Sequence, residues 1–209
     1  MASPQIRAII FDIGRVLVRV DIGRAMSALG SGLSMSSTEL WAAIEKDPRW
    51  PDWQEGRMSA RDWHLHLTRR LGVALTFEQF TQAWNQALEP EALQADALFE
   101  ALKKNHRLAL LSNTDPIHVA YLEANFSLFR YFPAPARIYS CRFGVSKPNP
   151  LLYREALRAC KTKAGEAVYI DDVAAYVEAA RNLGIWGIQY QGRQELLEEL
   201  RRLGIEVPG

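Results

Sequence analysis

Short apolar runs that alternate with helical patterns constrain the fold of this chain more than any other feature of its sequence. The runs are typical of strands buried on both faces of a parallel sheet, and they cover residues 7–11, 108–111, 137–141, 167–170 and 184–190. Helical patterns follow the last four runs, at residues 116–125, 150–160, 173–183 and 193–203. This alternation predicts an α/β fold with a doubly wound parallel sheet.

The first predicted strand is followed by far more chain than one crossover needs. Ser112 comes 100 residues after Asp12, whereas a strand–helix–strand unit takes roughly 30 residues. The intervening segment contains capping-box patterns that begin at Ser36 and Thr76, and a further N-cap pattern at Ser59. We therefore expect a helical cap at residues 19–89, inserted into an α/β core of residues 1–18 and 90–209. Residues 90–105 are expected to form the crossover helix.

Polar side chains follow four of the five predicted strands, at the sheet edge where ligands bind in open α/β folds. They are, in chain order, Asp12, Ser112 with Asn113, Lys147, and Asp171 with Asp172. A carboxylate after a buried strand needs a cation beside it or serves as a nucleophile. Adjacent carboxylates suit a hard divalent ion. The helix N-terminal amides that follow Ser112 suit phosphate oxygens.

Each of these positions also has an ordinary structural interpretation. The aspartates and Ser112 could cap turns or helices, and one residue of the Asp171–Asp172 pair could simply be solvated. Lys147 precedes a proline, which favours an extended backbone and a fixed positive charge, but a solvated loop lysine would look the same. The hypothesis of a shared site rests on all four positions together.

In the stretches FDIGRVLV, LLSNTD, GVSKPNPLLY and YIDDVAAYVEAARNLGI, the order Asp, Ser, Lys, Asp-Asp resembles the haloacid dehalogenase superfamily of phosphohydrolases. The resemblance covers residues 7–18 and about 105–190, and it is strongest to bacterial sugar phosphatases similar to glucose-1-phosphate phosphatase. It implies a Rossmann-like core with an inserted cap of the type called C1. It also implies a hydrolase that acts on a small phosphorylated metabolite, with a sugar phosphate expected.

The resemblance assigns a role to each matching residue. Asp12 would attack phosphorus and form an aspartyl-phosphate. Ser112 and the amide of Asn113 would hold phosphate oxygens, and Lys147 would offset negative charge. Mg²⁺ would be bound by Asp12, the carbonyl of Gly14 and Asp172, with Asp171 nearby. In the cap segment WPDWQEGRMS, the residues expected to contact substrate are Gln54, Glu55 and Arg57.

Two positions depart from the family pattern. Gly14 stands where many members carry a second aspartate that protonates the leaving group, although members similar to glucose-1-phosphate phosphatase share this glycine. Tyr176 stands where the last motif usually has Asp or Asn, so we expect weaker metal binding. Two alternative functions follow. One is a 2-haloacid dehalogenase-like enzyme, which Gly14 permits but the Asp171–Asp172 pair disfavours, and the other is a non-catalytic binding protein of the same fold.

Composition limits the partners of the chain. The 25 basic and 24 acidic residues give a net charge of +1, so no global electrostatic attraction favours nucleic acid or anionic lipid. No apolar run approaches the ~18 residues of a membrane span, and the N-terminus lacks a signal-peptide pattern. Two cysteines make no disulfide framework. We expect a cytoplasmic monomer or homodimer.

Overall fold

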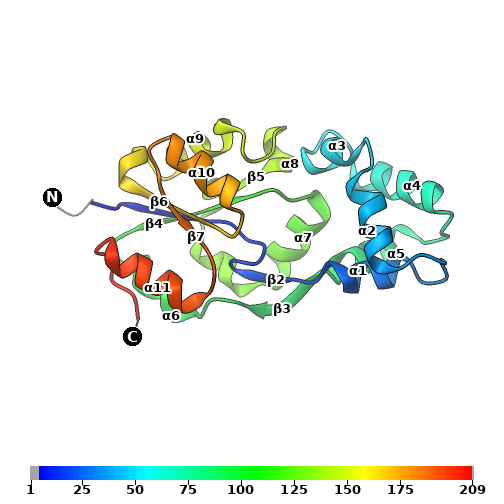
Figure 1. The fold of residues 1–209 in the computed structure, drawn as a ribbon, viewed down its shortest axis with the longest axis horizontal. Helices are drawn as coiled ribbons and strands as arrows, with labels where there is room; N and C mark the ends of the chain where they lie inside the picture. Colours follow the sequence, from blue (N-terminus) through cyan, green and yellow to red (C-terminus); the bar gives the residue numbers. More distant parts are fainter. Residues whose placement is uncertain (1–4, 209) are drawn as a thin grey trace.

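The computed structural model, which describes residues 5–208, has a parallel sheet at one end and a group of helices at the other (Figure 1). The sheet has the order β5-β4-β1-β6-β7, formed by Arg137–Tyr139 (β5), Arg107–Ser112 (β4), Ala8–Phe11 (β1), Ala167–Asp171 (β6) and Trp186–Gln189 (β7). All neighbouring pairs are parallel. The chain runs outward from β1 on one side and then returns to the other side. The predicted doubly wound parallel sheet is therefore confirmed.

Helices cover both faces of the sheet because alternate side chains of each strand point to opposite faces. Phe11, Leu110 and Ile170 are buried on one face, and Ile10 and Tyr169 on the other. The first face packs against α6 (Asp96–Leu102), α7 (Pro116–Asn125) and α11 (Arg193–Arg202), and the second against α9 (Pro150–Ala159) and α10 (Ala174–Asn182). Short 3₁₀ helices occupy Ser127–Tyr131 (η1), Ala134–Ala136 (η2) and Ala164–Glu166 (η3).

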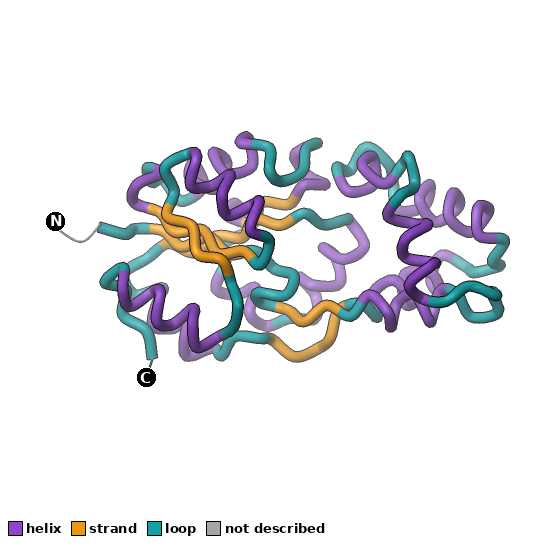
Figure 2. Tube along the Cα trace, in the orientation of Figure 1, coloured by secondary structure: helices purple, strands orange, loops and turns teal. Residues whose placement is uncertain are grey.

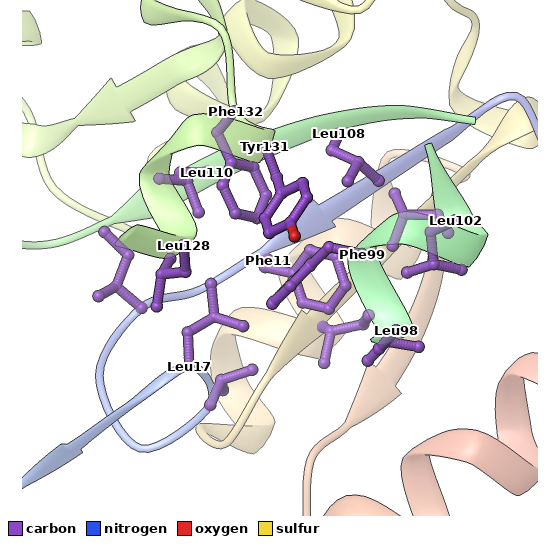
Figure 3. Close-up of a cluster of buried hydrophobic side chains, with 14 of the residues drawn as sticks. Phe11, Leu17, Leu98, Phe99, Leu102, Leu108, Leu110, Leu128, Tyr131 and Phe132 are labelled. Carbon is purple, nitrogen blue, oxygen red and sulfur yellow. The ribbon is translucent and has the colours of Figure 1, made fainter. Parts of the chain in front are cut away.

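A cluster of aromatic rings fixes the carboxyl end of β1 (Figure 3). The ring of Phe11 lies edge-on to Phe99 of α6, with centroids 5.9 Å apart, and to Phe132, at 6.1 Å. Tyr131 stacks on Phe99 at 5.1 Å. Edge-to-face and offset-stacked pairs are the favoured aromatic geometries and add to the stabilisation from burial. The residue that follows Phe11 is Asp12, so this packing holds the first predicted site residue in place.

Five helices form the opposite end of the molecule: α1 (Ile22–Leu29), α2 (Ser37–Glu45), α3 (Trp50–Gln54), α4 (Ala60–Leu71) and α5 (Phe77–Asn85). The capping boxes predicted at Ser36 and Thr76 are both present. The side chain of Ser59 caps α4, and Gly72 ends it in the left-handed conformation with φ of 68°. The rings of Trp53 and Trp63 stack 5.6 Å apart in the core of this group. We call α1–α5 the cap helices; residues 19 and 89 as the domain limits stay a prediction.

A two-stranded antiparallel ribbon connects the sheet to the cap helices (Figure 2). It pairs β2 (Val18–Val20) with β3 (Leu88–Ala92). The helix predicted for residues 90–105 is therefore wrong over its first part, because the pairing with β2 holds this segment extended and α6 begins only at Asp96. Pro90 is tolerated because a two-stranded ribbon has only edge strands.

One further difference is small. The strand predicted at residues 137–141 ends at Tyr139, and the next residues form the short helix α8 (Ser140–Phe143). Among the described residues, no helix combines the length and the apolar character that a membrane crossing requires. The cytoplasmic location stays a prediction.

Candidate active site

A buried lysine joins two of the predicted carboxylates at the carboxyl edge of the sheet. Lys147 Nζ donates to Asp12 Oδ1 at 2.8 Å and to Asp171 Oδ2 at 2.7 Å. It also lies 3.1 Å from the hydroxyl of Tyr169, which itself donates to Asp171. The side chain of Lys147 is only 2 % exposed. The solvated-loop interpretation of Lys147 is therefore wrong, and its charge is held between Asp12 and Asp171.

The side chain of Asn113 positions the loop that carries Lys147. Asn113 Oδ1 accepts a hydrogen bond from the Lys147 amide at 2.7 Å, and its Nδ2 donates to the Lys147 carbonyl at 3.2 Å. The Tyr176 hydroxyl lies 3.4 Å from the same Nδ2, and the Tyr176 ring centroid lies 4.9 Å from Lys147 Nζ. Asn113 and Tyr176 thus hold the lysine loop against the sheet edge. This role of the Asn113 side chain adds to the phosphate-binding role predicted for its amide.

Three carboxylates come together at this edge in a way that suits a cation. Asp12, Asp171 and Asp172 each offer an oxygen, and these oxygens all lie within 4.8 Å of one another. Asp171 is already bonded by protein groups, because its Oδ1 accepts from the Val173 amide at 2.8 Å and its Oδ2 accepts from Lys147 and Tyr169. Asp172 is less enclosed and its nearest basic partner is Arg15, at 3.7 Å. The oxygen donors therefore fit a hard divalent ion such as Mg²⁺, with Asp12 and Asp172 better placed as ligands than Asp171.

The electrostatics of the cluster leave an excess of negative charge. Burial, together with the neighbouring Asp171, raises the pKa of Asp12 from its ordinary 3.8 to about 6, although Lys147 opposes this shift. Burial and Asp171 also raise the pKa of Asp172. Burial alone would lower the pKa of Lys147, but its two carboxylate partners outweigh burial and the pKa is raised. One ammonium group thus serves two buried carboxylates, an imbalance that a bound cation would relieve.

This imbalance predicts that Asp12→Asn stabilises the metal-free protein. The pKa of Asp12 is higher in the folded state than in the unfolded chain, so the folded state loses stability as pH rises from about 4 to 6. Above that range the free energy of unfolding is lower by about 3 kcal/mol, because each unit of difference between the two pKa values corresponds to about 1.36 kcal/mol. Urea unfolding in EDTA at pH 7.5 should show a higher free energy of unfolding for Asp12→Asn, and the gain should vanish near pH 4. A variant less stable than wild type at pH 7.5 would contradict this electrostatic account.

A cavity of about 230 Å³ lies between the sheet edge and the cap helices. Its lining includes six of the predicted site residues, namely Asp12, Gly14, Gln54, Ser112, Asn113 and Asp172. Lys147 and Asp171 lie beside Asp12 and do not line it. Glu55 and Arg57 do not line it either. Arg57 forms ion pairs with Glu55 and Asp52, so the structure gives no contact between the cavity and these two predicted substrate-binding residues.

Comparison with known proteins assigns the family. The sequence pattern of haloacid dehalogenase-like hydrolases matches residues 6–184. The chain belongs to this family. A D-ribitol-5-phosphate phosphatase from Bacteroides thetaiotaomicron is 26% identical over 203 residues, covering 94% of this chain and 97% of the relative. The sesquiterpene phosphatase astK from Aspergillus oryzae is 25% identical over 209 residues, covering 94% and 96%.

Solved structures of haloacid dehalogenase-like proteins share the fold. A HAD family enzyme from Bacteroides thetaiotaomicron, crystallised with magnesium and inorganic phosphate, superposes with a TM-score of 0.78 at 21% identity and covers 90% of this chain and 95% of its own. An L-2-haloacid dehalogenase from Xanthobacter autotrophicus gives a TM-score of 0.62 at 20% identity, covering 96% and 84%. These structures share the fold, and the match over residues 6–184 confirms the family predicted from the strand-end residues.

Several polar residues of this site escaped the sequence analysis, and Tyr169, His118 and Ser140 make the most telling contacts. Tyr169 contacts Lys147 and Asp171, and its only signal was its place two residues before Asp171, on the same face of the strand. His118 lines the cavity, with Nδ1 3.0 Å from Asp115 Oδ2. Burial opposes this ion pair, but the mutual attraction prevails, lowering the pKa of Asp115 and raising that of His118. The available signal was the spacing of three residues, from the N-cap of α7 to its first turn.

The third of these missed residues, Ser140, lies where the cap helices meet the core. Ser140 Oγ donates to the carbonyl of Gln54 at 2.7 Å and accepts from the Thr114 amide at 2.9 Å. At the same contact, Gly56 has a φ of 70°, and a Cβ there would overlap the Cys141 carbonyl. Only glycine allows so close an approach without strain. This contact keeps α3, and with it Gln54, beside the cavity.

Proposed function

We propose that this hydrolase is a Mg²⁺-dependent phosphatase that cleaves small phosphate monoesters through an aspartyl-phosphate on Asp12. The observation that carries the proposal is the cluster of Asp12, Asp171 and Asp172 oxygens within 4.8 Å of one another, next to a buried lysine. Phosphoryl transfer needs positioning and charge stabilisation around one nucleophile, which such a cluster supplies. Two relatives that match this chain over nearly their whole length are named as phosphatases, which supports the same activity.

The residues divide the reaction between them. The Asp12 carboxylate attacks phosphorus, a new O–P bond forms, and the ester P–O bond breaks as the alkoxide departs and takes up a proton from water. Water then attacks the phosphorus of the aspartyl-phosphate and releases inorganic phosphate, which restores Asp12. Lys147 holds Asp12 in place and offsets charge, while Ser112 and the Asn113 amide bind phosphate oxygens. Mg²⁺, held by Asp12, Asp172 and the Gly14 carbonyl, would supply the positive charge that draws a phosphate into this acidic site.

The carboxylate cluster also separates this proposal from its alternatives. A 2-haloacid dehalogenase works on the same fold without a metal, but three clustered carboxylates would repel the carboxylate of a haloacid. A non-catalytic binding protein was suggested by Gly14 and Tyr176. Such a protein would have no need of a buried lysine shared by two carboxylates, whose burial is costly. The relatives' names leave the alcohol open, since one names a ribitol phosphate and the other a sesquiterpene.

A trapping experiment tests the proposal. Para-nitrophenyl phosphate should be hydrolysed with Mg²⁺ and not with EDTA. Beryllium fluoride with Mg²⁺ should inhibit the enzyme and form an adduct on the Asp12 carboxylate, visible in a crystal structure. Asp96→Asn, at an exposed position outside the cavity, serves as the matched control and should form the same adduct. An Asp12→Asn variant that keeps wild-type turnover would overturn the covalent mechanism.

A further inference from the structure

The side of the cavity formed by the cap segment is almost entirely apolar. Ten of its lining residues belong to the segment 19–89, and Gln54 is the single one among them without a mainly apolar side chain, the three tryptophans carrying one indole N–H each. The other nine are Val20, Ile22, Ala25, Met26, Trp41, Trp50, Trp84, Ala87 and Leu88. Phosphate bound at the sheet edge would direct the alcohol part of its ester toward this wall.

The two charged side chains near this wall are already paired within the protein. Asp115 Oδ2 accepts from Trp84 Nε1 and pairs with His118 Nδ1, both at 3.0 Å, and its Oδ1 accepts from the amides of Ile117 and His118. His118 Nε2 lies 3.1 Å from the Trp84 carbonyl. Neither side chain has a free group with which to bind a substrate hydroxyl. Gln54 and the indole N–H groups of Trp41 and Trp50 are therefore the uncommitted hydrogen-bonding groups that the cap helices offer to the cavity.

The aromatic part of the wall is held rigidly. Trp84 is fixed by its bond to Asp115, and the ring of Trp41 lies edge-on to Trp50 with centroids 5.4 Å apart. Trp50 in turn contacts Trp84, at 6.3 Å. A wall that is already ordered loses little conformational freedom when a ligand binds. Its chemistry therefore selects what enters.

We propose that the substrate is the phosphate monoester of an apolar alcohol, an alkyl or prenyl chain, and not that of a sugar or polyol. This inference rests on the proposed phosphatase function. Each hydroxyl of a polyol would give up its water in the cavity. The wall offers one amide and two indole N–H donors, so several hydroxyls would stay incompletely paired, which is costly. Each buried methylene of an alkyl chain instead strengthens binding by about fourfold.

A chain-length series tests the substrate class. The kcat/KM of n-alkyl monophosphates from propyl to octyl should rise by about fourfold per methylene until the cavity is full. The kcat/KM of the best alkyl phosphate should exceed that of ribitol 5-phosphate by about 10²-fold or more, which corresponds to three to four buried methylenes at about fourfold each. Ribitol 5-phosphate turned over as well as the best alkyl phosphate would overturn the inference. Para-nitrophenyl phosphate, tested in parallel, reports on the phosphatase function alone.

Matched variants and a binding measurement complete the test. Ile22→Gln places an amide in the apolar wall and should flatten the chain-length dependence, whereas Leu65→Gln, on an exposed cap position outside the cavity, should leave it unchanged. Calorimetric binding of n-alkylphosphonates needs no turnover. If no phosphate is hydrolysed but phosphonate affinity still rises with chain length, the proposed function fails and the apolar site stands. Affinity independent of chain length would overturn the site itself.

Discussion

A Gly14→Asp variant is expected to hydrolyse phosphates of unactivated alcohols about 10²- to 10⁴-fold faster than the wild-type chain, the usual contribution of a positioned general acid. Gly14 lines the cavity two residues after Asp12 and has no side chain that could protonate a departing alkoxide. The cluster around Asp12 would raise the pKa of a carboxyl added there and favour its protonated form. The measurement is kcat on an alkyl phosphate and on para-nitrophenyl phosphate, whose stable phenolate needs no proton and whose rate should change little.

The structure has room for this substitution. A Cβ added at Gly14 would meet only Val20 Cγ2, at the ordinary contact distance of 3.5 Å. Unfolding of the variant in EDTA should be measured beside the rates, because a fourth carboxylate near the cluster adds repulsion that Mg²⁺ would relieve. A folded variant whose alkyl and aryl phosphate rates both equal those of wild type would show that proton donation is supplied elsewhere or does not limit turnover.

Lys147→Met should have the largest effect in the opposite direction. It leaves the buried carboxylates of Asp12 and Asp171 without their shared partner. We expect kcat to fall by about 10²- to 10³-fold or more, as when one preorganised charge-stabilising donor is lost. The free energy of unfolding in EDTA at pH 8 should fall by about 3–5 kcal/mol, the cost of breaking one side of a buried ion pair.

The pH dependence of the stability of Lys147→Met shows whether its stability loss comes from the missing charge or from altered packing. Without the ammonium, the pKa of Asp12 rises further above its ordinary value, so protonation near pH 5.5 should neutralise it and recover part of the lost stability. Lys104→Met, at an exposed position, is the control and should change neither stability nor rate. A stability loss in Lys147→Met that is equal at pH 5.5 and pH 8 would point to packing and against the charge balance described for this site.

The elements predicted correctly are those whose signals are local. The strands of the sheet appear as apolar runs because both faces are buried, and the caps of α2, α4 and α5 depend on residues three apart. Because parallel strands end at one edge of the sheet, the polar residues after them could be expected to meet there. The buried lysine–carboxylate contact follows from that topology.

The features that were missed depend on contacts between distant parts of the chain. The ribbon of β2 and β3 pairs Val20 with Leu88, and no local sequence pattern near Pro90 predicts pairing with a segment so far away in the sequence. The sequence also does not reveal which way a side chain points on a short helix of the cap. Gln54 lines the cavity while its neighbour Glu55 pairs with Arg57 outside it. Trp53 is buried in the cap, as expected for a core tryptophan, whereas Trp50 reaches the cavity.

Because of the ribbon of β2 and β3, the cap helices that form the cavity wall can change in evolution while the catalytic edge of the sheet stays the same. The ribbon holds Val20 beside Leu88, and the Asp21 amide donates to the Ala87 carbonyl at 2.8 Å, so the segment between them enters and leaves the core at one point. To the sheet, this segment is a closed loop, and the entropy of closing a loop changes only slowly with its length. Its helices can therefore be lengthened, exchanged or repacked at little cost to the sheet. A lineage could acquire new alcohols as substrates while Asp12 and Lys147 stay as they are.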